Sequence, residues 1–436
     1  MNKLLIRVAT GLSTAALVAY SFVGPALAVD VEVSGNGANS NNTANVSVSN
    51  STIVDQSNVA NISNDVNVNA DTGKNDANGN TGGNVSIDTG DATANVGVSN
   101  TANSNIANVD GCCAGDVSVT IGGDKPNGAN STNVAKVGVS NTNWVDQFNR
   151  ATVRNDVDVD ADSGKNDANR NTGGDVSITT GGAGTGNTGV VIANAVNKNV
   201  ASIGSGPNSG SLAVVISGNG YKSKNTATVT VMAEEGVLQK NIANLSNDVD
   251  VDADTGKNDA NANTGGDVTI DTGDAVANVD VSNLANFNAA DVDSCGCILD
   301  GTVTIKNNGA ESKNVANVSL TGLTYASQDN LYSCGHLPLA GLITSGVPNN
   351  GPQNQKPCND VDVDLDTGKN DANRNTDSDE PSVLTGDATA DILVETTANS
   401  NVVGEVGSDW GFPELPDNSN GSSVSLVLLW LLAHFS

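Results

Sequence analysis

One block of residues occurs four times along this chain, and it constrains the fold more than any other feature. The block "NDVDVDADSGKNDANRNTGGDVSI" runs from Asn155 to Ile178, and related blocks begin at Asn64, Asn247 and Asn359. The first three blocks are almost evenly spaced, and the fourth begins somewhat farther along the chain. A long repeat period is typical of architectures in which each repeat stacks on its neighbours. The sequence therefore predicts an array of stacked units.

The composition suits a thin, layered fold. Only 3% of the 436 residues are aromatic, and 48 are glycine. A compact core in a chain of this length needs many large apolar side chains to offset chain entropy. Polar, acidic chains can also stay disordered. The regular alternation of Val and Ile with polar residues favours strands instead.

The net charge limits the partners that the chain can bind. It is −30 at pH 7, with a pI near 4.1. Nucleic-acid binding needs clustered Lys and Arg, which an acidic surface does not offer. Cations or basic proteins are the natural counterparts, and the simpler alternative is a solvated acidic surface that keeps the protein soluble.

Residues 1–28 are expected to be an export signal. Lys3 and Arg7 supply the charged start, residues 8–23 are mostly apolar, and Ala26-Leu27-Ala28 forms a small-x-small cleavage site. The removed piece carries two positive charges and no negative ones, so the net charge of the mature chain changes from −30 to −32. We expect an extracellular or cell-surface protein.

Each long repeat contains two related halves, and every half carries two amide residues two positions apart. Residues two apart on a strand share a face, so stacked copies can form an amide ladder. A polar ligand site is the functional alternative. The ladder positions are Gln56, Asn58, Asn103, Asn105, Gln147, Asn149, Asn197, Asn199, Gln239, Asn241, Asn286, Asn288, Gln328, Asn330, Asn399 and Asn401.

Short Val/Ile strand pairs recur at close intervals within each long repeat, with Gly, Asn, Asp and Ser between them. The first pairs after the export signal are Val46/Val48, Val66/Val68 and Val85/Ile87. Such a short step suits one coil of a β-solenoid or one β-arch. We therefore expect an all-β, elongated rod over residues 29–406, built as a four-repeat β-solenoid of stacked β-arches. The alternative is an array of small β-sandwich modules.

Three stretches resemble curlin-type repeats: "VDQSNVANI" from Val54, "VDQFNRATV" from Val145 and "VLQKNIANL" from Val237. The wider Asn-rich repeats resemble secreted proteins of the bacterial cell surface. The resemblance implies a β-solenoid with a role in extracellular matrix or adhesion. The Asp-rich block and the long period depart from the curlin pattern.

The acidic block predicts a candidate calcium site. Asp156, Asp158, Asp160 and Asp162 lie two apart, so a strand would project all four carboxylates from one face, about 6.6 Å apart. Hard cations favour several oxygen ligands, although Gly164 is misplaced for a standard calcium loop. The alternative is a solvated strand followed by a turn, in which the repeated lysine pairs with local carboxylates and the preceding Gly takes positive φ. The candidate ligands are Asp65, Asp71, Asp76, Asp156, Asp158, Asp160, Asp162, Asp167, Asp248, Asp250, Asp252, Asp254, Asp259, Asp360, Asp366 and Asp371.

The cysteines of an exported chain are expected to form disulfides. Cys112-Cys113 and Cys295-Gly296-Cys297 occupy matching places in two repeats. The third and fourth blocks are separated by an insertion, and the extra residues lie between Cys334 and Cys358. We therefore expect a disulfide-closed insertion at 335–357, which is either a binding loop or an extra coil.

Residues 407–436 form a linker and a hydrophobic tail. Leu415-Pro416-Asp417 resembles a degraded LPxTG sorting signal, and Val424–Phe435 is shorter than a membrane span. The tail is a truncated surface anchor or a strand that caps the rod. We expect a structural or adhesive surface protein without enzymatic activity, with matrix components or further copies as partners. The alternative is a polysaccharide-binding or polysaccharide-lyase-type β-helix.

Overall fold

The computed structural model describes residues 4–13, 17–23, 29–110, 116–204, 211–292, 301–334, 358–377 and 381–404. Every regular element in these ranges is a β-strand, and every pairing between named strands is parallel. The expected all-β architecture is therefore confirmed at the level of parallel strands stacked in sheets.

The strands form four sheets. The long sheet contains β4 (Asn41–Asp71), β8 (Thr132–Asp162), β12 (Lys224–Asp254), β16 (Lys313–Cys334) and β17 (Asn359–Asp366). The return sheet contains β1 (Leu4–Ser13), β2 (Leu17–Val23), β6 (Ala92–Asp110), β10 (Ala183–Gly204), β14 (Ala275–Val292) and β19 (Ala388–Val403). The first short sheet contains β5 (Val85–Asp88), β9 (Val176–Thr179), β13 (Val268–Asp271) and β18 (Ser382–Leu384). The second short sheet contains β3 (Val29–Val33), β7 (Val117–Gly122), β11 (Leu212–Ser217) and β15 (Gly301–Lys306).

Each long repeat forms one layer. Val46 pairs with Val137, Val137 with Val229 and Val229 with Val318, so partners lie one long period apart. The expectation that one short step between strand pairs is one coil is wrong, because Val46 and Val66 lie along a single extended strand, β4. The repeats are not separate sandwich modules either, since pairing runs between repeats and not within them.

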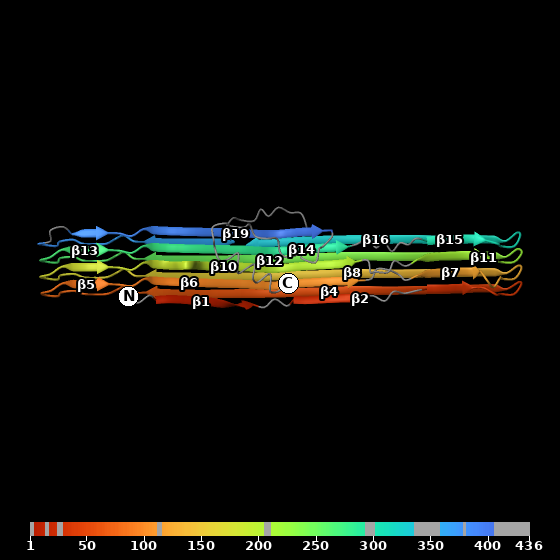
Figure 1. Ribbon diagram of the computed structural model, residues 1–436, viewed down its shortest axis with the longest axis horizontal. Helices are drawn as coiled ribbons and strands as arrows, with labels where there is room; N and C mark the ends of the chain where they lie inside the picture. The colour runs from red at the N-terminus through yellow and green to blue at the C-terminus, as the bar shows by residue number, and fades with distance from the viewer. Residues whose placement is uncertain are drawn as a thin grey trace, which may run out of the picture.

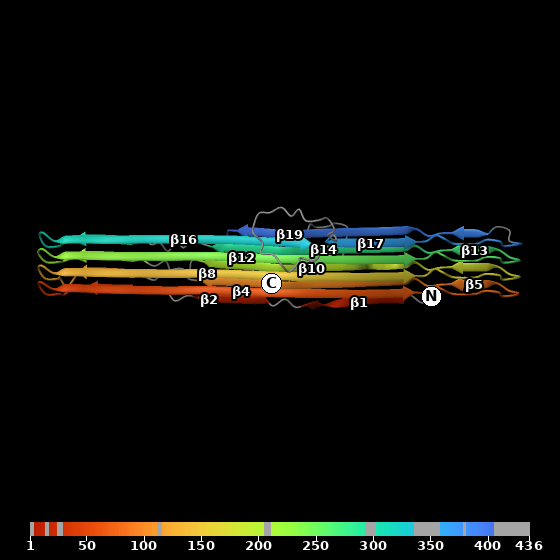
Figure 2. The same ribbon diagram turned by 180° about the vertical axis from the view of Figure 1, so that it is seen from behind.

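The long axis consequently runs along the strands (Figures 1 and 2). A strand of 31 residues such as β8 spans about 100 Å, whereas four layers at about 4.8 Å each stack to only about 20 Å. Within the described residues, the chain reverses in segments rich in Gly, Asn and Asp, such as those between β4 and β5 and between β7 and β8.

The core is a narrow zone between the long sheet and the other sheets. Val157 and Val159 of β8 pack against residues of the return sheet such as Val96 and Ile192. At the other end, Ile121 and Ile216 of the second short sheet pack against the start of the long strands. Small side chains are enough to fill this zone because the long sheet and the sheets that face it lie close together. A chain poor in aromatic residues can therefore bury a core.

Side-chain amides fill the middle of this zone as continuous columns. Gln147 donates its Nε2 to Gln56 Oε1 at 2.7 Å, and Gln239 donates to Gln147 Oε1 at 2.8 Å. Gln328 continues the column by donating to Gln239 Oε1 at 2.7 Å. A primary amide both donates and accepts, so one residue type can continue such a column through every layer.

The two halves of each repeat meet through these amides. Asn105 of β6 donates to Asn149 of β8 at 2.9 Å and to Asn199 of β10 at 2.9 Å. Asn199 in turn donates to Asn241 of β12 at 2.8 Å. From one layer to the next, these hydrogen bonds alternate between the long sheet and the return sheet. They alternate along Asn58, Asn105, Asn149, Asn199, Asn241, Asn288, Asn330 and Asn401.

The remaining predicted amides lie where the return strands take a left-handed backbone conformation. Asn103 and Asn197 have φ of 62° and 64°, and Asn103 donates to Asn197 Oδ1 at 2.8 Å. Asn197 donates to Asn286 at 2.9 Å, and Asn286 donates to Asn399 at 2.9 Å. Asn tolerates the left-handed region better than most residues, which suits it to this position.

The structure contains further amide columns that the sequence reasoning missed. One joins Asn155 to Asn247 at 2.6 Å, and another joins Asn166 to Asn258 at 2.9 Å. Both positions are Asn in all four repeats, and this invariance was the available signal. The turn is therefore tied together by the same kind of contact as the strands.

A disulfide bond joins Cys334 to Cys358, with Cα atoms 4.5 Å apart. Cys334 pairs with Leu245, and Asn359 pairs with Asn247, so the fourth layer leaves the register of β12 and rejoins it at the disulfide. The insertion at 335–357 itself lies outside the described residues. Cys112, Cys113, Cys295, Cys297 and the tail at 407–436 also lie outside them.

We expect Asn199→Asp to lower the free energy of unfolding by about 3 kcal/mol or more, because it removes two donated hydrogen bonds and buries a carboxylate. Asn199 is fully buried and donates to Asn241 and Asn288. The matched control is Asn401→Asp, since Asn401 is exposed and accepts from Asn288 and Asn330. Urea unfolding of both variants measures the difference. Equal effects would contradict a structural role for the buried column.

Candidate functional site

Eight side chains of the repeated block form a regular acidic face on the outer side of the long sheet. Layer one contributes amides and the three later layers contribute carboxylates. Asn67 donates to Asp158 at 2.9 Å, and Asn69 donates to Asp160 at 3.2 Å. The face consists of Asn67, Asn69, Asp158, Asp160, Asp250, Asp252, Asp362 and Asp364.

The strand register brings these carboxylates together. Asp158 pairs with Asp250, and Asp250 pairs with Asp362, so each column has like charges about 4.8 Å apart in successive layers. Burial and then the neighbouring carboxylates Asp158 and Asp362 raise the pKa of Asp250. Burial and then Asp160 and Asp364 raise the pKa of Asp252 in the same way. The face therefore accumulates negative charge that a cation would offset.

A neighbouring column, Asp65, Asp156, Asp248 and Asp360, follows the same register. Arg154 donates to Asp156 at 2.9 Å and so satisfies part of this column. Of the four acids expected to share one face in the second repeat, three lie on the outer side of β8. The fourth, Asp162, is buried where the strand ends.

Asp162 belongs to a charged column in the turn. Its Oδ1 accepts from the Gly164 N–H at 3.0 Å, and its Oδ2 lies 2.5 Å from Lys165 Nζ. Lys165 also lies 3.5 Å from Asp254 of the next layer. Burial alone would lower the pKa of Lys165, but its hydrogen bonds and charge contacts with Asp162 and Asp254 raise it overall. This agrees with the alternative in which the lysines pair with local carboxylates.

The expectation about the glycine of this turn is wrong. Lys165 itself has positive φ, at 56°, and so do Lys74, Lys257 and Lys369. The preceding Gly164 is required for a different reason, because a Cβ on it would collide with the Gly256 carbonyl oxygen of the next layer. Absence of a side chain, and not left-handed backbone, is what this position needs.

The third set of candidate ligands stands in a column of its own. Asp76, Asp167, Asp259 and Asp371 form isolated bridges in the turn. Burial and the neighbouring Asp259 and Asp76 raise the pKa of Asp167. Within the described residues, no group of three or more His, Cys, Asp or Glu side chains is arranged to hold a metal ion. The carboxylates are therefore distributed over columns and do not converge on one centre.

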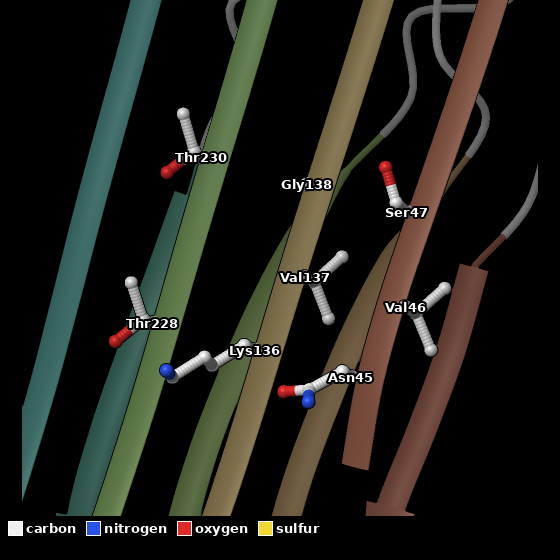
Figure 3. A pocket seen from close by; sticks show the side chains of 8 residues that line it. All are labelled: Asn45, Val46, Ser47, Lys136, Val137, Gly138, Thr228 and Thr230. Atoms are coloured by element: carbon white, nitrogen blue, oxygen red, sulfur yellow. The ribbon is translucent and has the colours of Figure 1, made fainter.

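Two other features mark the outer side of the long sheet. A shallow groove lies over Gly138, where the column Ser47–Gly138–Thr230 lacks a side chain, and Lys136 and Asn45 border it (Figure 3). Farther along the strands, Trp144 and Tyr325 stack with ring centroids 6.1 Å apart and planes inclined by 10°. Gly236 pairs with both residues and leaves room for the rings to meet. Across the ranges that the structure describes, no helix is long and apolar enough to cross a membrane.

We expect the free energy of unfolding to increase as the pH falls from about 7 toward about 4. The pKa values of Asp167, Asp250, Asp252 and Asp259 are raised above the ordinary value of 3.8. The folded state then binds more protons than the unfolded state just above that pH, so stability rises on acidification.

Below about pH 4 the trend reverses. The Lys369 hydrogen bond lowers the pKa of Asp366, so the stabilisation from that carboxylate is lost as the pH falls through its folded value. Urea unfolding across the pH range measures the free energy of unfolding both above and below about pH 4; the part above about pH 4 is called the upper limb. The double variant Asp250→Asn/Asp252→Asn should flatten the upper limb, and an unchanged slope would contradict this account.

Comparison with known proteins gives no match: no protein-family model, no curated protein and no solved structure matches this chain. A functional conclusion therefore depends on the residues and their geometry.

Proposed function

We propose that this chain is an exported structural or adhesive scaffold of a cell surface, built as a flattened β-solenoid with one long repeat per turn. The observation that supports this most directly is the in-register stacking of the repeated blocks. Identical or related residues occupy equivalent places in every layer, from Asp156 to Asp248 and from Gln147 to Gln239. Such repetition produces a uniform, extended surface, as a scaffold requires.

Export is supported by the sequence of residues 1–28. The disulfide between Cys334 and Cys358 is of the kind that persists in oxidising compartments outside the cytoplasm. The large negative charge of the chain would keep the scaffold soluble before it reaches its partners. The partners that we propose are matrix or wall components, with the C-terminal tail as a means of attachment.

Calcium is the cation that we propose for the acidic face. Asp158, Asp250 and Asp362 offer exposed carboxylate oxygens in successive layers, and the adjacent column through Asp160 offers a second row. Calcium accepts many oxygen ligands in flexible geometry, so it suits a grid of carboxylates better than metals that need nitrogen or sulfur. Binding would link layers that otherwise repel one another.

A second function, polysaccharide binding, is favoured by the Trp144–Tyr325 stack on the outer side of the long sheet. Tyr325 is 48% exposed, and Asp146 of the same strand as Trp144 offers a polar partner. Sugar rings pack on aromatic faces while neighbouring polar groups bind their hydroxyls.

We expect millimolar calcium to raise the Tm of the purified chain, because a cation that binds only the folded state stabilises it by mass action. The double variant Asp250→Asn/Asp252→Asn should lose most of that increase. The matched control is Asp30→Asn/Glu32→Gln, which removes two exposed carboxylates from β3, away from the acidic face. Thermal unfolding with sodium at equal ionic strength separates binding from screening. An identical response to sodium would remove calcium from the proposal.

Polysaccharide binding is tested with Trp144→Ala and a panel of immobilised acidic and neutral polysaccharides. If the protein is a scaffold that does not bind polysaccharide, its retention should not depend on Trp144. At least about tenfold weaker retention of Trp144→Ala, equivalent to about 1.4 kcal/mol, would favour the polysaccharide function.

The scaffold proposal predicts that antibodies against the long sheet label intact, unpermeabilised cells. Absence of labelling on such cells would contradict a surface scaffold.

A further inference from the structure

The fourth layer ends the stack with its core side chains exposed. Val303 and Ile305 of β15 are 50% and 48% exposed, whereas Val214 and Ile216, their partners in the third layer, are fully buried. Ile392 of β19 is 46% exposed, and its partner Val279 is 2% exposed. The described strands of the fourth layer, β15, β16, β17, β18 and β19, each have a neighbour on one side only. An open edge with an apolar lining is a template for another strand layer.

The lysine column identifies what fits on this edge. Each lysine of the first three layers contacts the aspartate of its own layer and that of the next layer: Lys74 lies 3.5 Å from Asp162, Lys165 lies 3.5 Å from Asp254, and Lys257 lies 3.9 Å from Asp366. Lys369 is the equivalent lysine of the fourth layer. Within the described residues its salt bridge is to Asp366 of its own layer, and its side chain is 71% exposed.

The first layer presents the complementary group. Asp71 pairs with Lys74 of its own layer and keeps 31% of its side chain exposed. It occupies the place in the column that an aspartate of a fifth layer would have. The Gln column is also directional, in the opposite sense, because each Gln donates to the Gln of the preceding layer, from Gln147 to Gln56 and from Gln328 to Gln239.

We propose that the fourth layer of one copy stacks on the first layer of a second copy, with Lys369 of the first copy contacting Asp71 of the second. The contact repeats the junction that already joins layers within the chain. It is heterologous and leaves a free face at each end, so repeated addition gives an open filament. This inference goes beyond the proposed scaffold function and does not depend on calcium.

The amino-terminal segment regulates this contact. β1 pairs with Ala92–Val98 of β6, and β2 pairs with Ser104–Asp110 of the same strand. These are the β6 positions that β19 of another copy would occupy, because β19 holds the equivalent positions on β14. β1 and β2 therefore block part of the first layer until cleavage after Ala28 removes them.

The test compares the chain that begins at Val29 with the unprocessed chain in calcium-free buffer. Sedimentation velocity over about a hundredfold range of concentration should show association of the processed chain, with much weaker association of the unprocessed chain. Electron microscopy should show ribbons that grow perpendicular to the strands. A processed chain that stays monomeric throughout would overturn the proposal. Association of that chain only after deletion of 405–436 would also overturn it, because the tail would then be the occupant of the edge.

A charge exchange tests the contact itself. Lys369→Glu should weaken association at least about tenfold, whereas Lys136→Glu, which makes the same charge change on the outer face of the second layer, should not. Asp71→Lys should also prevent self-association. A mixture of the Lys369→Glu and Asp71→Lys variants should associate again into filaments in which the two variants alternate, because both faces of each variant are complementary only to the other variant. Equal effects of Lys369→Glu and Lys136→Glu, or failure of the mixture to pair while both variants keep their circular dichroism, would overturn the assigned contact.

Discussion

Parallel, in-register contact between equivalent residues of successive repeats is the constraint on which the rest of this structure depends. Because each residue stacks on a residue of the same type, the buried positions between the sheets can hold only side chains that pack against, or hydrogen-bond to, an identical side chain. Val and Ile do so by packing, and Asn and Gln do so because an amide can donate to one neighbour and accept from the other. The buried columns through Asn149, Asn199 and Gln239 satisfy this condition without any buried charge.

The same constraint destabilises the folded state at the outer acidic columns, because it places like charges in contact. Asp158, Asp250 and Asp362 are forced into register by the strands that carry them, and each like-charge contact costs on the order of 1 kcal/mol in water at such distances. The turn handles charge differently, because Lys165 lies between two aspartates of successive layers. One repeated block thus contains a column in which lysines balance the aspartates and a column without such balance, and the second is where we propose that calcium binds.

Sequence reasoning predicted several local features from composition and period. The all-β class followed from alternating Val and Ile, the amide columns followed from paired Asn and Gln positions, and the Cys334–Cys358 disulfide followed from an insertion with a cysteine at each end. The size of one layer was wrong. The short steps between Val/Ile pairs looked like coils, yet β4, β8 and β12 each continue for 31 residues. Amides between these pairs, such as Gln147 and Asn149, face inward and do not mark turns.

The sequence by itself determined which residues must meet, because a long period with matching blocks specifies the register of every layer. The tertiary structure alone decided where the chain reverses and what each repeated position does there. Gly164 and Asp162 illustrate the difference: Gly164 lacks a side chain because a carbonyl of the next layer approaches it, and the buried Asp162 pairs with lysines of two successive layers. Both roles arise from contacts between residues far apart in the chain, so a local pattern cannot reveal them.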